Sequence, residues 1–266
     1  YIPVAAHGAH PKVTDPALYA AKDSDTAFLT NAYLADSATR EPPNWFAHLT
    51  YLRPHPPLVA PAPYNTLYDP QKLPLPHRLN SQFAEEAVHP FFAPMFDSTT
   101  PADFVSGMPD LKPDEGTVQA LRAVYLGLAS EVDHHIGRVI TDLKQAGRYE
   151  DTLVIITADH GEMLGDRHAW GKMSVYNAAY HTPLIIRAPQ LQAQSGMQVQ
   201  LQTESVDIAP TILDWIGSDI PNSMDGRSLM PLIKGEAPKN WRKCTFSELY
   251  FGHPLFPTEW QKQLGL

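Results

Sequence analysis

The spacing of hydrophobic residues changes along the chain and predicts alternating helices and strands. Over residues 116–147, apolar side chains recur at steps of three and four, which predicts one long amphipathic helix closed by Gly147. A β-branched run follows at 152–158, and a second lies at 183–188. Runs of this kind, without polar alternation, are typical of strands covered on both faces, as in a parallel sheet. The pattern then returns to helical spacing over 205–216, closed by Gly217.

Weaker patterns flank this core. Asp25 can cap a helix over 26–40, and residues 45–52 are rich in aromatic side chains and resemble a buried strand. A last strand is predicted at 245–249. The order helix, strand, loop, strand, helix is typical of an α/β fold, which we therefore predict.

The prolines divide the chain into loop and regular structure. Fifteen of the 26 prolines lie between Pro42 and Pro113, and none lies between Asp114 and Thr182. Because a proline inside a helix costs about 3 kcal/mol, we predict a proline-rich loop region at 53–113. The helix-strand-loop-strand core is then expected at 116–188.

Composition narrows the class of protein. With 266 residues, 43% of them hydrophobic, the chain can form a single α/β domain over 1–266. A net charge of -9 argues against nucleic-acid binding, and no apolar run approaches 18 residues, so we expect no membrane partner. The lone cysteine, Cys244, excludes a disulfide scaffold and is expected to be an inert core residue. Low cysteine usage, with no visible signal sequence, favours the cytoplasm.

The candidate chemistry lies directly after the first predicted core strand, in Asp159, His160, Gly161 and Glu162. In open α/β sheets, ligands bind beyond the carboxyl ends of strands. Carboxylate and imidazole are plausible ligands for divalent cations, and Lys172 could present its ammonium group to an anionic substrate oxygen. Further polar residues follow at Asp166, His168 and His181.

Several of these residues also have plain structural interpretations. Asp-His-Gly after a strand can be an ordinary turn, and a His-Pro pair such as that at His55 is common in loops. We interpret His134 and His135 on the long helix as structural. Glu131 and Asp133 are interpreted as a solvated helix face.

Taken together, the motifs resemble the C-terminal half of a sulfatase, in the alkaline-phosphatase superfamily. The similarity is carried by residues 151–162, by Gly171-Lys172 and by residues 180–186. Residues 131–138, 205–211 and 225–229 are similar to flanking parts of that family. Residues 52–57, with 60–64, look most like the branch of phosphonate monoester hydrolases and arylsulfatases.

The resemblance implies a three-layer sandwich with a mixed, largely parallel sheet, incomplete in this chain. It implies that Asp159 and His160 are ligands of a divalent metal (Mn, Ca or similar). Lys172 would contact the non-bridging oxygens of a small anionic ester substrate, and His55 would contact the substrate or its leaving group. His168 matches no catalytic position of the family.

The family nucleophile is a cysteine or serine in Cys/Ser-x-Pro/Ala-x-Arg, with the cysteine oxidised to formylglycine. This sequence contains neither that motif nor the Asp-Asp pair that supplies further metal ligands. We therefore expect a fragment, truncated at both ends, that is inactive alone. A missing first strand would expose a sheet edge and favour a homo-oligomer.

The leading hypothesis is a metal-dependent hydrolase of sulfate, phosphonate or phosphate esters. The alternative is a non-catalytic anion-binding or assembly module on the same fold. A third hypothesis is another superfamily branch, such as a nucleotide phosphodiesterase or phosphoglycerate mutase. The matches at Gly171-Lys172 and at residues 53–57 argue against this third hypothesis.

Overall fold

The computed structural model describes residues 2–4, 24–39, 44–89, 92–93, 96, 99–189, 191, 195–236, 238–248 and 262. Its helices are α1 (Asp25–Thr39), α2 (Gln82–Glu86), α4 (Glu115–Gln145), α5 (Asn177–Tyr180), α6 (Ile208–Trp215) and α7 (Met230–Ile233). Its strands are β1 (Ile2–Val4), β2 (Ala47–Leu49), β3 (Val154–Thr157) and β4 (Leu184–Arg187). The predicted order of helix, strand, loop, strand and helix is confirmed by α4, β3, β4 and α6.

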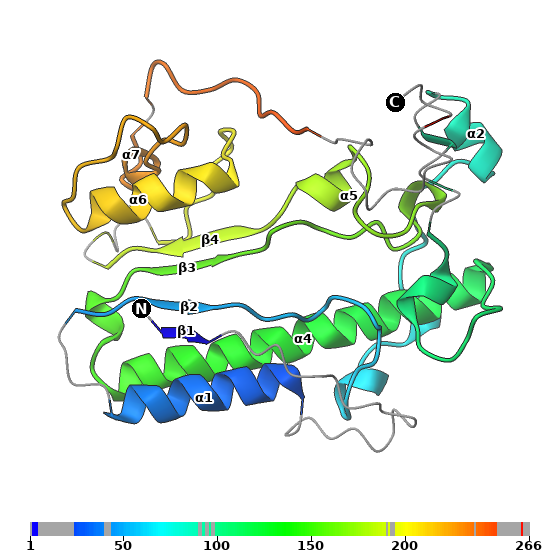
Figure 1. The fold of residues 1–266 in the computed structure, drawn as a ribbon, viewed down its shortest axis with the longest axis horizontal. Coiled ribbons are helices and arrows are strands. Elements are labelled where there is room, and N and C mark those ends of the chain that lie inside the picture. The colour runs from blue at the N-terminus through cyan, green and yellow to red at the C-terminus, as the bar shows by residue number, and fades with distance from the viewer. Residues whose placement is uncertain are drawn as a thin grey trace.

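The strands lie between two groups of helices (Figure 1). Helices α1 and α4 run alongside each other on one side of the strands, and α6 and α7 cover the other side. Burial of apolar side chains between strands and helices is what stabilises such layers. The end of β3 from which the chain enters the Asp159 segment points away from α6 and α7.

Helix α4 has the predicted position, and its two ends have clear chemical causes. The Asp114 carboxylate accepts a hydrogen bond from the Thr117 amide (2.8 Å) and caps the first turn. At the other end Gly147 has a φ of 65°, a left-handed conformation that favours glycine. The Gly147 amide donates to the Lys144 carbonyl, and the Arg148 amide donates to the Leu143 carbonyl, which closes the helix.

The two core strands pair antiparallel, so the prediction of parallel strands is wrong here. Val154 lies opposite Arg187 and Thr157 opposite Leu184. The parallel pair is instead β1 with β2, in a separate two-stranded sheet. The connection from β3 to β4 contains the 3-10 turn Asp166–His168 and the four-residue helix α5, and it returns to the end of the sheet where β3 finishes. A parallel pair would need a crossover along the whole sheet.

Three predicted elements at the edges of the core need correction. Helix α1 is capped by Ser24, whose hydroxyl accepts from the Ala27 amide (3.0 Å), and not by Asp25; Arg40 lies outside the described residues. The strand predicted at 45–52 is reduced to β2, in which His48 is exposed. A run of aromatic residues therefore does not by itself make a fully buried strand.

The last predicted strand is absent from its described part, residues 245–248; Leu249 lies outside the described residues. Cys244 is exposed, and the prediction that it is a core residue is wrong. The strand does not form in residues 245–248 because a side chain, and not a neighbouring strand, accepts the backbone hydrogen bond. The Phe246 amide donates to the Glu204 carboxylate (3.0 Å), and the Phe246 ring is 85% exposed.

The proline-rich region packs along the first half of α4. The 3-10 turn Tyr64–Thr66 lies against Gly127, where an added Cβ would stand 2.2 Å from the Tyr64 carbonyl oxygen. Nearby, the hydroxyl groups of Tyr68 and Ser130 share a hydrogen bond of 2.8 Å. The main apolar core joins this region to α4 and consists of Leu58, Ala60, Phe104, Val118, Leu121, Leu128 and Trp170.

A buried ion cluster connects the residues just before α6 to the chain that follows this helix. Asp207 is fully buried and accepts hydrogen bonds from the amides of Glu204 and Arg227 (both 2.8 Å) and from the guanidinium group of Arg242. Burial alone would raise the pKa of the Asp207 carboxyl, but these donors outweigh it and the pKa is lowered. The carboxylate therefore ties residues 204–207 to the chain near Arg242.

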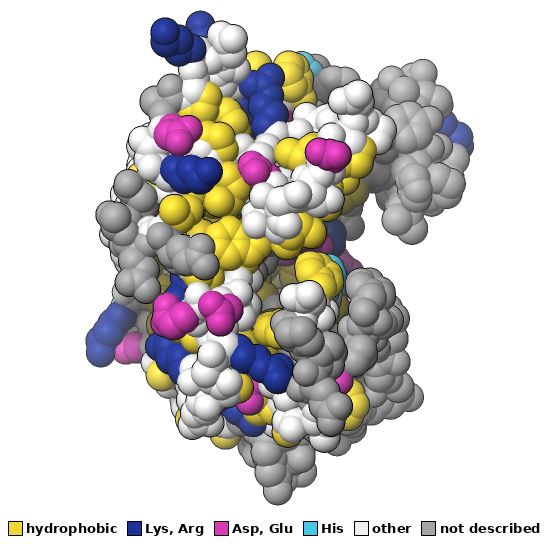
Figure 2. All heavy atoms as spheres, turned by 90° about the vertical axis from the view of Figure 1, so that its left-hand side faces the viewer, with side chains coloured by type: hydrophobic (Ala, Val, Ile, Leu, Met, Phe, Trp, Pro, Cys, Tyr) yellow, Lys and Arg dark blue, Asp and Glu magenta, His cyan; other side chains and the backbone are white. Residues whose placement is uncertain are grey.

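Apolar surface remains exposed on this structure. Figure 2 shows hydrophobic side chains gathered across the middle of one end of the molecule. On the elements described here, Ile185 in β4 is 60% exposed and Ile216, after α6, is 65% exposed. None of the helices in the described part of the chain is long and apolar enough to cross a membrane.

Replacing Gly127 by alanine is expected to destabilise the fold by about 1–3 kcal/mol, because the new methyl group overlaps the Tyr64 carbonyl. The matched control is Gly137→Ala on the same helix, where nothing lies within 4 Å. That change should stabilise the fold by about 0.5–1 kcal/mol, because alanine favours the helix. Urea unfolding measures both. A Gly127→Ala chain as stable as Gly137→Ala would show that the contact with Tyr64 is not tight.

Asp207→Asn is expected to cost about 3 kcal/mol at pH 7, because it leaves Arg242 without its buried partner. Since the folded pKa of Asp207 lies below its ordinary value, the stabilisation is present above about pH 4 and is lost as the pH falls through the folded pKa. The free energy of unfolding should thus fall less steeply in the variant than in the wild type on acidification below pH 4. Asp219→Asn, at an exposed position of the neighbouring segment, is the control.

Candidate active site

The candidate site begins where β3 ends. Asp159 lies two residues beyond Thr157, and its side chain is 86% exposed. Its Oδ1 atom accepts a hydrogen bond from the His160 amide (2.9 Å), and its Oδ2 atom lies 3.5 Å from Nε2 of His160. Carboxylate and imidazole therefore face the same small volume at the carboxyl end of the strand.

His160 has its two ring nitrogens fixed in different roles. Nδ1 lies 2.8 Å from the Gly161 carbonyl oxygen, which can only accept, so Nδ1 carries the proton. Nε2 is then the acceptor, and it lies 2.7 Å from Nζ of Lys172. The structure thus brings Asp159, His160 and Lys172 together, although Lys172 is 12 residues away along the chain.

Gly161 allows this segment to lie against α5. A Cβ atom at Gly161 would stand 2.0 Å from the Ala178 carbonyl oxygen. The Gly161 amide donates to the Ala179 carbonyl (2.7 Å), and the Glu162 amide donates to the Ala178 carbonyl (2.9 Å). The backbone that follows His160 is therefore held against α5.

Glu162 is a residue whose role the sequence did not reveal. One of its carboxylate oxygens, Oε1, accepts from the amides of Gly171 (2.6 Å) and Leu164 (3.3 Å). Burial raises the pKa of Glu162, although these backbone donors oppose the shift. Burial, with the charge of Glu162, also raises the pKa of Tyr125 to about 12. The only sequence signal was the position of a glutamate directly after Asp-His-Gly.

His55 is not in direct contact with the other three candidates. Its side chain is exposed, and its Nδ1 atom hydrogen-bonds to the Pro56 carbonyl (2.8 Å). In the part of the chain described, no hydrogen bond or ion pair joins His55 to Asp159, His160 or Lys172.

The loop that carries His55 is nevertheless anchored to the Lys172 segment. The Leu58 amide donates to the Phe104 carbonyl (2.7 Å), and the Phe104 ring packs on Trp170 with centroids 5.5 Å apart. Trp170 is only two residues from Lys172. Arg53 braces the same loop, because its Nη1 atom donates to the carbonyls of His55 and Pro57.

The other polar candidates lie in separate structural roles. Nε2 of His168 donates to the Leu79 carbonyl (2.9 Å). Asp166 accepts from the His77 amide (2.9 Å) and from Nη1 of Arg122 (3.1 Å). His181 is exposed at the end of α5.

The interpretation of Glu131 on α4 as a solvated residue is wrong. Glu131 is fully buried, not solvated, because the Arg53 loop and α1 pack over that part of the helix. Burial raises its pKa, and the Arg53 guanidinium group opposes the rise. Asp133 is exposed, as expected. His135 is buried, as a structural histidine would be, and burial lowers its pKa to about 4.

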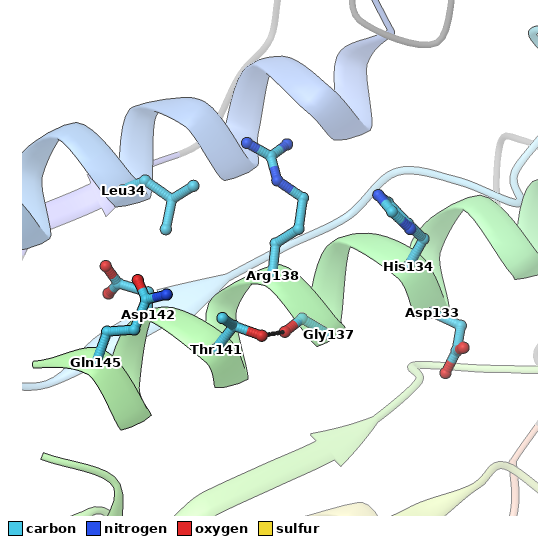
Figure 3. Close-up of a pocket in the computed structure, with 8 residues that line it drawn as sticks. All are labelled: Leu34, Asp133, His134, Gly137, Arg138, Thr141, Asp142 and Gln145. Carbon is cyan, nitrogen blue, oxygen red and sulfur yellow. Dashed lines mark hydrogen bonds between the residues drawn. The ribbon is translucent and has the colours of Figure 1, made fainter. Parts of the chain in front are cut away.

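A pocket of about 630 Å³ lies elsewhere, between α1 and α4 (Figure 3). It is lined by Leu34, Asp133, His134, Gly137, Arg138, Thr141, Asp142 and Gln145. Arg138 extends across it towards α1, where its Nη2 atom donates to Asn31 (2.8 Å). The pocket contains none of the candidate site residues, so it is separate from the candidate site.

Within the described residues, no group of three or more His, Cys, Asp or Glu side chains could hold a metal ion. The pair Asp159 and His160 nevertheless fits such an ion in its chemistry. A proton held on Nδ1 by a carbonyl leaves Nε2 as the lone-pair atom, the arrangement usual for metal-binding histidines, although in this structure Nε2 accepts from Lys172 and a metal ion would take the place of that hydrogen bond. A carboxylate oxygen stands beside it.

Comparisons with known proteins identify the family of the chain. The sequence model of the sulfatase family matches residues 5–218. The multifunctional alkaline phosphatase superfamily protein PehA of Trinickia caryophylli is 34% identical over 261 residues, covering 96% of this chain and 51% of PehA. Arylsulfatase K of Bos taurus is 39% identical over 129 residues, or 48% of this chain and 23% of that protein.

Two solved structures are similar over nearly the whole chain. The phosphonate monoester hydrolase SpPMH from Silicibacter pomeroyi has a TM-score of 0.91 and 62% identity, covering 96% of this chain and 50% of that protein. The phosphonate monoester hydrolase of Agrobacterium radiobacter has a TM-score of 0.87 and 36% identity, covering 97% and 52%. The chain thus spans about half the length of these relatives. It belongs to the sulfatase family.

Proposed function

We propose that this chain is the part of a phosphonate ester hydrolase that binds the metal and the anionic ester. The observation that carries the proposal is the convergence of Asp159, His160 and Lys172 at the end of β3. Support also comes from the 62% identity to the phosphonate monoester hydrolase of Silicibacter pomeroyi. The substrate would be a small anionic ester.

Asp159 and His160 would hold a divalent cation such as Mn or Ca. Bound there, the cation would supply a positive charge for the oxygens of the ester. The protein's own contribution is the orientation of the two ligands: the His160 amide fixes the Asp159 carboxylate, and the Gly161 carbonyl fixes the imidazole. Both groups are therefore positioned before any ion arrives.

Lys172 would bind the non-bridging oxygens of the ester. An ammonium group is a compact charge on a flexible stem, so it can follow an oxygen on which negative charge collects. His55 would act at the leaving group as a proton donor or an electrostatic stabiliser. The packing of Phe104 on Trp170 supports this role, because it connects the His55 loop to the Lys172 segment.

We further propose that the chain contributes to a three-layer sandwich with a mixed sheet, with residues 53–113 as the substrate-side loop region and 116–188 as the core. The exposure of Ile185 in the middle of β4 supports this architecture, because an apolar residue in a core strand is normally covered by another layer. The exposed apolar surface is also consistent with association into a homo-oligomer.

The proposal is tested with a chimera in which this chain replaces the matching half of the Silicibacter pomeroyi hydrolase. The chimera should hydrolyse 4-nitrophenyl phenylphosphonate, and Lys172→Met should lower kcat/KM by about 100-fold or more. His55→Ala should lower it by about 100-fold, and 4-nitrophenyl sulfate serves as the competing substrate. A folded, metal-loaded chimera without turnover would favour the non-catalytic anion-binding module instead.

The 266 residues alone contain no Cys/Ser-x-Pro/Ala-x-Arg motif, so we expect little or no turnover from them without a partner segment. We also expect them to bind Mn more weakly than micromolar, because two ligands make an incomplete site. In titration calorimetry Asp159→Asn should abolish the remaining binding, whereas Asp133→Asn, at an exposed position of α4, should leave it unchanged. Micromolar or tighter binding would mean that further ligands exist in the chain.

A further inference from the structure

Lys172 reaches His160 because the chain between them forms a closed loop. At the base of this loop, the Met163 amide donates to the Gly171 carbonyl (2.9 Å). The Gly171 amide does not return to a backbone carbonyl; it donates to Oε1 of Glu162 (2.6 Å). A side chain thus makes one of the two hydrogen bonds that close the loop.

Oε1 of Glu162 holds the loop at two places. It accepts from Gly171, directly before Lys172, and from Leu164, near the start of the loop (3.3 Å). Gly171 has a φ of 78°, so the chain turns sharply at this point. The direction in which Lys172 leaves the loop therefore depends on where the Gly171 amide is held.

The loop is strained both near its start and at its far end, and the far end is fixed from outside. Leu164, Arg167 and His168 all have positive φ values (45°, 56° and 60°), which non-glycine residues rarely adopt. The Arg167 amide donates to the His77 carbonyl, and the His168 ring donates to Leu79. With this end anchored to residues 77–79, the base of the loop is the place where the position of Lys172 is decided.

We propose that Glu162 is a positioning residue: by accepting the Gly171 amide, it sets Lys172 at hydrogen-bonding distance from His160. The inference rests on the proposed function for its catalytic meaning, because Lys172 is the group that would bind the ester. Its structural content is independent of substrate. The glutamate side chain is long enough to accept hydrogen bonds from both amides. Glutamine keeps an acceptor oxygen at the same distance from the backbone, whereas aspartate keeps the charge but is one methylene shorter.

The test reads the contact itself by ¹⁵N NMR of the His160 imidazole in the full 266-residue chain treated with a chelator. Lys172→Met defines the Nε2 shift expected when the contact is lost. Glu162→Leu should reproduce the Lys172→Met shift, and Glu162→Gln should retain the wild-type shift. Glu115→Leu, at an exposed position in the first turn of α4, is the control and should change nothing.

Glu162→Asp keeps the result decisive if Glu162→Leu does not fold. If the position of the carboxylate matters, the His160 Nε2 shift of Glu162→Asp moves towards that of Lys172→Met. If only the charge matters, the shift stays at the wild-type value, and the proposal is wrong. A wild-type shift in folded Glu162→Leu would also overturn it, because the packing of Trp170 would then suffice to place Lys172.

The chimera separates this inference from the proposed function. There, Glu162→Asp should lower kcat by up to about 100-fold, as a misplaced group does, and Glu162→Gln should restore most of the rate. If the unsubstituted chimera is inactive while the NMR contact depends on Glu162, the proposed function fails and the positioning role stands.

Discussion

Helix α4 anchors several of the segments that shape the candidate site. Near its start, Arg122 donates to Asp166 and to the Leu164 carbonyl, and so holds the strained loop. One turn further, Tyr125 lies close enough to Glu162 for that charge to raise its pKa. Gly127 then admits the backbone of Tyr64, and with it the proline-rich region. A helix of 31 residues spans roughly 46 Å, so a single rigid element sets the relative positions of loops far apart in sequence.

Buried carboxylates are the second organising feature of this acidic chain. Asp207 is neutralised by Arg242 and two backbone amides, so it remains charged to unusually low pH. Glu85, equally buried, accepts from the Leu79 amide and lies 3.6 Å from Arg167. Burial is the main cause of the raised pKa of Glu131. Asp207 and Glu85 each join separate segments, and their directional hydrogen bonds give these joints a defined geometry.

Much of the core could be predicted from the sequence, because its signals are local. The three- and four-residue spacing and Gly147 define α4, and the β-branched runs define β3 and β4. Strand direction could not be predicted, since it depends on how the connection through α5 folds back and not on the strands themselves. For the same reason, Glu131 looked solvated: only the packing of α1 and of the Arg53 loop buries it.

The site shows the same division. Asp159 and His160 are neighbours in sequence, so their proximity follows from the motif alone. The family resemblance implied that Lys172 acts at the same site, but its direct contact with His160 required coordinates. The role of Glu162 also required coordinates, because a side chain that replaces a backbone acceptor leaves no periodic signal. For the fold as a whole, local sequence patterns predict the helices and strands. Long-range contacts determine which other elements each of them packs against.

The hydrogen bonds of the Asp159–Glu162 segment also limit how a transition state could be stabilised. The His160 amide is used by Asp159, and the next three amides donate to Ala179, Ala178 and Gly171. The amides of residues 160–163 are therefore not available to form an oxyanion hole of the kind that serine hydrolases build from main-chain amides. Negative charge that develops beside these residues would be met by side chains such as that of Lys172 and by any bound cation. A flexible side chain can adapt to anions of different size and shape more readily than a rigid backbone cradle.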